Sequence, residues 1–179
     1  MLPILLVALC VILRVIPHPP NFAPVGATAM FAGRTMKPWM ALTLVAVAMF
    51  IGDAVLAWLH GYPLVSLVTP FVYGGFFLQA LLGRVLRSRK GGVIAAAALG
   101  ALGFFALSNV GVWVGSAMYP HTTAGLLTCC LEAVPFLGRT LLGDLFFSVA
   151  LSAVYKTVAT RLGPGRRWVP VPVEELAIV

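Results

Sequence analysis

The sequence predicts an all-α membrane protein: a six-helix transmembrane bundle with one additional outer half-helix that does not cross. Of its 179 residues, 61% are hydrophobic and only 9% are charged, and the mean hydropathy is +1.03. Soluble domains carry about 25% charged residues, so this composition excludes a soluble enzyme and a disordered chain. A helix needs about 20 apolar residues to cross a bilayer, and six crossings therefore occupy most of the chain.

Apolar runs separated by Pro, Gly and charged residues mark the expected helices. They are 1–17, 22–34, 38–59, 64–84, 91–115 and 140–160, with a shorter apolar segment at 124–137. The first two are short because Pro17, Pro19 and Pro20 interrupt the run, and proline removes a backbone donor and restricts its predecessor. In this interpretation residues 1–162 form the six-span membrane domain, and the proline-containing stretch 163–179 is a short cytoplasmic tail.

The positive charges predict the orientation. Ten of the twelve Lys and Arg residues lie between the second and third helices, between the fourth and fifth, or after the last. The positive-inside rule makes this side cytoplasmic, so we expect both termini in the cytoplasm. For the helices to alternate in direction, the segment 124–137 must not cross, and we expect a re-entrant or interfacial helix there.

The polar residues of the membrane region gather near the outer surface. Asp53, Glu132 and Asp144 are the only acids before the tail. At 1.5 Å per residue, Asp53, Asn109 and Asp144 lie at similar depths within their helices, and Arg14 reaches the same depth. An ionised group there costs about 2.5–3.5 kcal/mol. We therefore expect these side chains to face the bundle, with Arg14 pairing with Asp53 or Asp144.

A mainly apolar pocket with a few converging polar groups is typical of a ligand site, and we expect such a pocket to open outward. Its predicted ligand-binding residues are His18, Asn21, Asp53, Asn109, Trp113, Tyr119 and Asp144. The amides would supply donors and acceptors, the aromatic rings a stacking wall, and Asp53 an acceptor or a countercharge. No metal or cofactor is expected. The alternative is a structural or assembly subunit without a ligand, in which the polar layer only fixes the order of the helices.

The sequence argues against other classes of function. It contains no GxSxG, HExxH or P-loop motif, so we expect neither an enzyme nor a nucleotide site. Its basic residues form no continuous surface interleaved with aromatic residues, which argues against nucleic acid as a partner. The expected partners are a small molecule from the outer side, the lipid bilayer and, for uphill uptake, an energising membrane partner with an ATPase.

Four stretches resemble a family of small bacterial integral membrane proteins of unknown function. They are RVIPHPPNFAPVGATAMFAG at 14–33, SNVGVW at 108–113, YPHTTAGL at 119–126 and LLGDL at 141–145. The first contains the pattern RxxPHPPNFxPxxA, and the four together extend over nearly the whole bundle. The resemblance implies a multi-pass protein of the bacterial inner membrane.

That family is in turn similar to the S components of energy-coupling-factor vitamin transporters. S components are six-helix proteins that bind a vitamin beneath extracellular loops and hand it inward by toppling in the membrane. The resemblance implies a vitamin or cofactor-like ligand and a role in its uptake. S components dock on their coupling partner through small residues spaced four apart in the first helix, whereas Ala23 and Ala27 have this spacing in the second segment.

Overall fold

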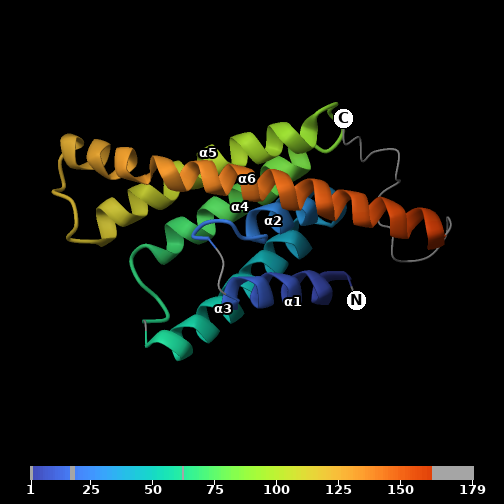
Figure 1. The fold of residues 1–179 in the computed structure, drawn as a ribbon, viewed down its shortest axis with the longest axis horizontal. Coiled ribbons are helices and arrows are strands. Elements are labelled where there is room, and N and C mark those ends of the chain that lie inside the picture. Colours follow the sequence, from blue (N-terminus) through green and yellow to red (C-terminus); the bar gives the residue numbers. More distant parts are fainter. Residues whose placement is uncertain (1, 17–18, 62, 163–179) are drawn as a thin grey trace.

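The computed structural model describes residues 2–16, 19–61 and 63–162, and these residues contain six α-helices (Figure 1). In chain order they are α1 Leu2–Val15, α2 Val25–Thr35, α3 Pro38–His60, α4 Thr69–Val85, α5 Gly92–Gly115 and α6 Thr123–Leu162. These residues contain no strand, which confirms the predicted all-α class. By length and composition, α3, α5 and α6 could cross a membrane. The predicted tail 163–179 lies outside the described residues.

The loops divide between two ends of the molecule. The loops that follow α3 and α5 lie at one end, and the α4–α5 turn lies at the other, together with the start of α1 and the end of α6 (Figure 1). The basic residues of 84–90 and of 156–161 belong to this second end. Gly61 closes α3 in the left-handed region, with φ +71°, a conformation that glycine adopts without a Cβ penalty.

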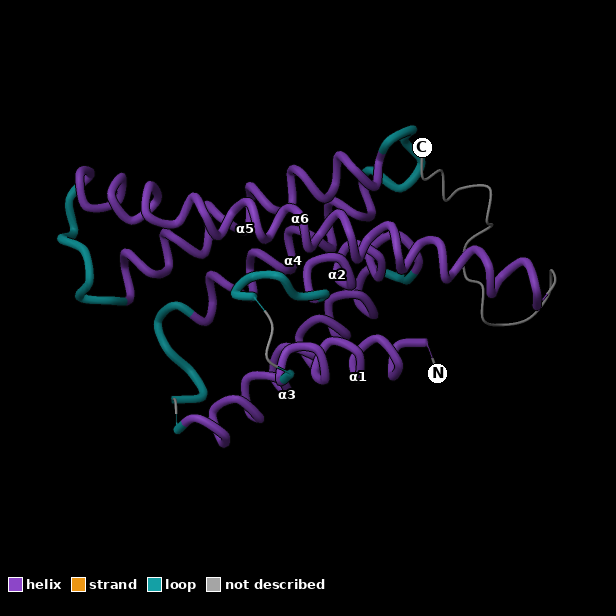
Figure 2. Tube along the Cα trace, in the orientation of Figure 1, coloured by secondary structure: helices purple, strands orange, loops and turns teal. Residues whose placement is uncertain are grey.

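The short helix α2 lies at the centre of the bundle (Figure 2). All eleven of its residues are buried, and it packs against each of the other five helices. It approaches α4 closely, because a Cβ at Gly33 would lie 1.9 Å from the Ala80 carbonyl oxygen and one at Gly83 would lie 2.2 Å from that of Met30. Small residues permit such contacts between membrane helices.

α2 is too short to be one of the six predicted membrane crossings. Eleven residues rise about 16 Å, roughly half the thickness of the hydrocarbon layer. The helix begins only at Val25, after Pro24, so the expected span at 22–34 is a buried half-length helix. The structure therefore shows six helices, three of which could cross a membrane by length and composition.

The separate half-helix predicted at 124–137 is wrong. One continuous helix of 40 residues, α6, contains this segment, the predicted break after it and the predicted last span. Pro135 lies inside α6 on an exposed face and removes only one backbone donor there. The segment also packs along α5, where the Cys129 Sγ lies 3.6 Å from the Asn109 carbonyl oxygen. Packing against α5 thus accompanies a single helix where the alternation of the spans predicted a separate segment.

Candidate functional site

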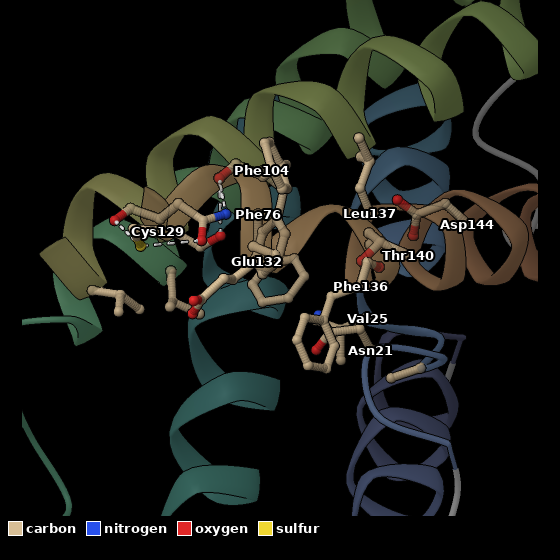
Figure 3. Close-up of a pocket in the computed structure, with 18 of the residues that line it drawn as sticks. Asn21, Val25, Phe76, Phe104, Cys129, Glu132, Phe136, Leu137, Thr140 and Asp144 are labelled. Carbon is tan, nitrogen blue, oxygen red and sulfur yellow. Dashed lines mark hydrogen bonds between the residues drawn. The ribbon is translucent and has the colours of Figure 1, made fainter. Parts of the chain in front are cut away.

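A cavity of about 610 Å³ lies where the start of α2 meets α4, α5 and α6. Most of its lining is apolar, and the rings of Phe76, Phe104 and Phe136 lie between Glu132 and Asp144 (Figure 3). Polar side chains reach the cavity from five parts of the chain. They are Arg14, Asn21, Ser108, Asn109, Tyr119, Glu132, Thr140 and Asp144.

The first polar cluster joins α1, α3 and α4. One carboxylate oxygen of Asp53 forms an ion pair with Arg14 and accepts a hydrogen bond from Arg14 Nη2. The other oxygen accepts a hydrogen bond of 2.9 Å from the Tyr73 hydroxyl. Arg14 reaches Asp53 over Gly52, where a Cβ would lie 3.0 Å from Arg14 Cδ. The charges of Arg14 and Asp53 therefore compensate each other beside the cavity.

The second polar cluster joins α2, α4 and α6. Asp144 is 2% exposed, and its carboxylate accepts a hydrogen bond of 2.6 Å from Gln79 Nε2 and another from the Ala27 backbone N–H. Ala27 lies in the first turn of α2, whose dipole favours a negative group. A Cβ at Gly26 would lie 2.2 Å from Asp144 Oδ1, so only glycine leaves room for this carboxylate.

A third polar contact lies at the cavity near the α5–α6 loop. Tyr119 donates a hydrogen bond of 2.6 Å from its hydroxyl to Glu132 Oε2, which raises the pKa of Tyr119 to about 12. Asn109 lies deeper and donates through Nδ2 to the Phe105 carbonyl oxygen at 2.8 Å. Its side-chain donor is thus engaged by its own helix.

The structure brings together five of the eight residues selected from the sequence. Arg14, Asn21, Asn109, Tyr119 and Asp144 line the cavity. Asp53 is held beside it through Arg14.

One of the eight is placed differently. Trp113 is not among the lining residues, because its Nε1 donates to the Pro120 carbonyl oxygen at 3.0 Å and its ring packs edge-on against His121. His18 lies outside the described residues.

Several residues of the site were not selected from the sequence. They are Gln79, Glu132, Thr140 and the phenylalanines of the lining. Gln79 carried a usable signal, because it is a lone polar residue within the apolar run 76–82 of α4. Glu132 carried one as well, since it is one of only three acids before the tail. The described residues contain no group of three or more His, Cys, Asp or Glu side chains that could hold a metal ion.

The fold and site define an all-helical protein with three helices able to cross a membrane. Its mainly apolar cavity, which a few polar groups reach, lies beside a buried short helix. The chain belongs to a family of unknown function, DUF6580, whose model matches residues 1–167. Searches of curated proteins and of solved structures gave no match.

Proposed function

We propose that this protein binds a small molecule in the cavity beside α2 and takes part in its uptake across the bacterial inner membrane. The observation that carries the proposal is the cavity itself. Its volume of about 610 Å³ falls within the range of about 300–1,000 Å³ that is usual for small-molecule sites. Its apolar wall, with a few polar groups from several helices, also has the composition of such a site.

The position of α2 supports a role in transport. Its N-terminal turn borders the cavity through Val25 and Gly26, and the helix is about half as long as a span. Transporters commonly build substrate sites from discontinuous helices whose termini lie inside the membrane. Tyr119 and Val112 line the cavity near the α5–α6 loop, opposite the end that holds the cations of 84–90. With the basic end in the cytoplasm, the cavity opens toward the outer side, and both termini are cytoplasmic.

The similarity to S components adds the finer part of the proposal. It favours a vitamin or cofactor-like ligand and an energising membrane partner with an ATPase. The absence of a P-loop motif from the sequence fits this division of labour, because uphill uptake then needs an external source of energy.

A structural or assembly subunit is the second candidate, and the polar clusters favour it. Arg14–Asp53–Tyr73 joins three helices, and Asp144–Gln79–Ala27 joins another set of three. Such clusters can fix helix order without any ligand.

Native mass spectrometry of the gently purified protein separates the two candidates. We expect a stoichiometric small molecule in the wild-type protein, its loss in Ser108→Phe, which fills the cavity, and its retention in Ala106→Phe. Ser108 lines the cavity, whereas Ala106 is exposed on the same helix. An empty wild-type protein that co-purifies with a large complex would favour the assembly subunit.

A further inference from the structure

The lining of the cavity holds more acidic than basic residues. Its ionisable lining includes Arg14, Glu132 and Asp144, and the charge of Arg14 is already met by Asp53. Glu132 accepts from a neutral hydroxyl, and Asp144 accepts from a side-chain amide and a backbone N–H. Among the described residues, neither acid forms an ion pair. Two acids without a cationic partner therefore border one cavity.

The nearest cation along α6 does not change this balance. Arg139 lies between the two acids in sequence, and its guanidinium carbon lies 5.9 Å from the centroid of the Phe136 ring. It is exposed and forms no ion pair in the described part of the chain. Glu132 and Asp144 are twelve residues apart in α6, which corresponds to about 18 Å along its axis. A small ligand therefore meets one of them at a time.

One acceptor beside Asp144 lacks a donor. Gln79 Oε1 has no hydrogen-bond partner, and Gln79 is 0% exposed. The position of a Cβ at Gly26 lies 2.2 Å from Asp144 Oδ1 and 2.6 Å from Gln79 Oε1, so the two oxygens are neighbours beside a residue that lines the cavity. A buried acceptor without a partner costs free energy. Asp144 lines the cavity and is the acceptor of this cluster that a ligand with a positively charged N–H group meets, with Gln79 hydrogen-bonded to it.

The aromatic wall fits the same kind of ligand. Phe76 and Phe104 pack with ring centroids 4.7 Å apart, and both line the cavity together with Phe136 (Figure 3). The faces of aromatic rings attract cations, and the rings also bury an apolar body. An anion would instead meet a carboxylate at either end of the cavity.

We propose that the ligand of this cavity is an organic cation, with an ammonium or N–H-bearing cationic group that donates to Asp144 and an apolar body that lies among the phenylalanine rings. This inference rests on the proposed function, because it assigns a chemical class to the ligand of the same cavity.

The first test uses three probes with a shared phenylalkyl skeleton: 2-phenylethylammonium, 2-phenylethanol and 3-phenylpropionate. Their binding to the purified full-length protein is measured by saturation-transfer NMR at equal concentrations. We expect only the ammonium compound to bind to the wild-type protein. Its binding should be lost in the Ser108→Phe variant. Equal or better binding of the alcohol or the carboxylate would overturn the inference while leaving a small-molecule cavity in place.

The second test removes the charge of Asp144. Asp144→Asn keeps the shape of the side chain and should weaken binding of the ammonium probe at least about tenfold, as expected for a hydrogen bond to a charged group. Thr128→Val, at an exposed position of the same helix that does not line the cavity, is the control and should change binding less than about threefold. Equal effects of the two changes would overturn the role assigned to Asp144. The selectivity among the three probes is measured on the wild-type protein, so the inference stays testable if Asp144→Asn does not fold.

Failure of the inference and of the proposed function can be told apart. If none of the three probes binds, the inference is tested by the charge of any compound that co-purifies with the wild-type protein. A cation supports the inference, and a neutral or anionic compound overturns it while the proposed function stands. An empty cavity together with no probe binding overturns both.

Discussion

Arg14 and Asp53 show how a single charged pair holds two helices together. The pair joins α1 to α3, and the Tyr73 hydroxyl extends it to α4. The side chains are 21% and 19% exposed, so both are largely removed from solvent. Neither charge has another ionic partner among the described residues. Loss of one member would leave the other uncompensated.

We therefore expect Asp53→Asn to destabilise the protein by about 1–3 kcal/mol, less than the 3–5 kcal/mol that is typical of a fully buried pair. Thermal unfolding in detergent measures the change. Adding Arg14→Leu to Asp53→Asn should restore part of the lost stability, because it removes the stranded cation. If Asp53→Asn instead leaves stability unchanged and abolishes ligand binding, Asp53 is a ligand group.

Gly26 is the residue at which a single methyl group should matter most. Its Cβ would overlap Asp144 Oδ1 and crowd Gln79, both of which are buried. Gly26→Ala should therefore break the Asp144–Gln79 hydrogen bond and cost about 1–3 kcal/mol, the usual range for overpacking. Gly74→Ala is the matched control, because no atom lies within 4 Å of its Cβ position in α4.

Thermal unfolding of both variants checks this prediction. Gly74→Ala should be neutral or stabilise the protein by up to about 1 kcal/mol, because alanine is the better helix former. Equal stability of the Gly26→Ala protein and the wild type would show that the second polar cluster can rearrange without cost.

At the residue scale, the gathering of polar groups at one cavity was predictable, and their levels along the helices were not. Arg14, Asn109 and Asp144 all line the cavity, but Asn109 contacts Cys129, which precedes Asp144 by fifteen residues in α6, or about 22 Å along the helix axis. The same reasoning selected Trp113, which instead hydrogen-bonds to the adjoining loop. A strongly apolar helix such as α5 has no polar face that reveals its rotation, so only packing decides which side chains point inward.

At the scale of elements, α6 is the main departure from the sequence-based prediction. Pro135, Gly138 and Arg139 lie close together, and each is an ordinary signal for the end of a helix or span. The signal is local, whereas the packing of residues 125–129 against α5 is not. Long-range contacts of this kind leave no pattern in the sequence, which is why the continuous helix could not be predicted.

A distance between two spin labels tests the continuity of α6. Leu127 and Val154 are 60% and 63% exposed and lie 27 positions apart in the helix, which corresponds to about 40 Å. Labelled cysteines at these positions, in a protein whose native cysteines are replaced, should give a narrow distribution near that value. A re-entrant segment that folds back before the last span would shorten the distance markedly.

At the scale of the whole molecule, composition was the most informative feature. It correctly predicted an all-helical chain with segments able to cross a membrane. It could not show that the Ala- and Gly-rich segment after Pro24 is enclosed by the other helices, because small residues suit both a short span and a buried helix.

The proposed orientation is tested on intact cells with single cysteines in a cysteine-free background. Ala117 lies in the α5–α6 loop and Ser88 in the α4–α5 turn, and both are exposed. A membrane-impermeant maleimide should label Ala117→Cys directly and Ser88→Cys only after the membrane is permeabilised. The reverse pattern would invert the proposed topology and place the mouth of the cavity in the cytoplasm.

The enclosure of α2 also bears on how the chain is made. This helix leaves the ribosome before α3 to α6, and it is too short to be inserted as a stable span of its own. Its first turn needs a protein partner wherever water is absent, and that partner, Asp144, is synthesised near the far end of the chain. The segment that emerges among the first is therefore among the last to reach its final packing. Biogenesis must hold it in an unfinished state until α6 has been translated.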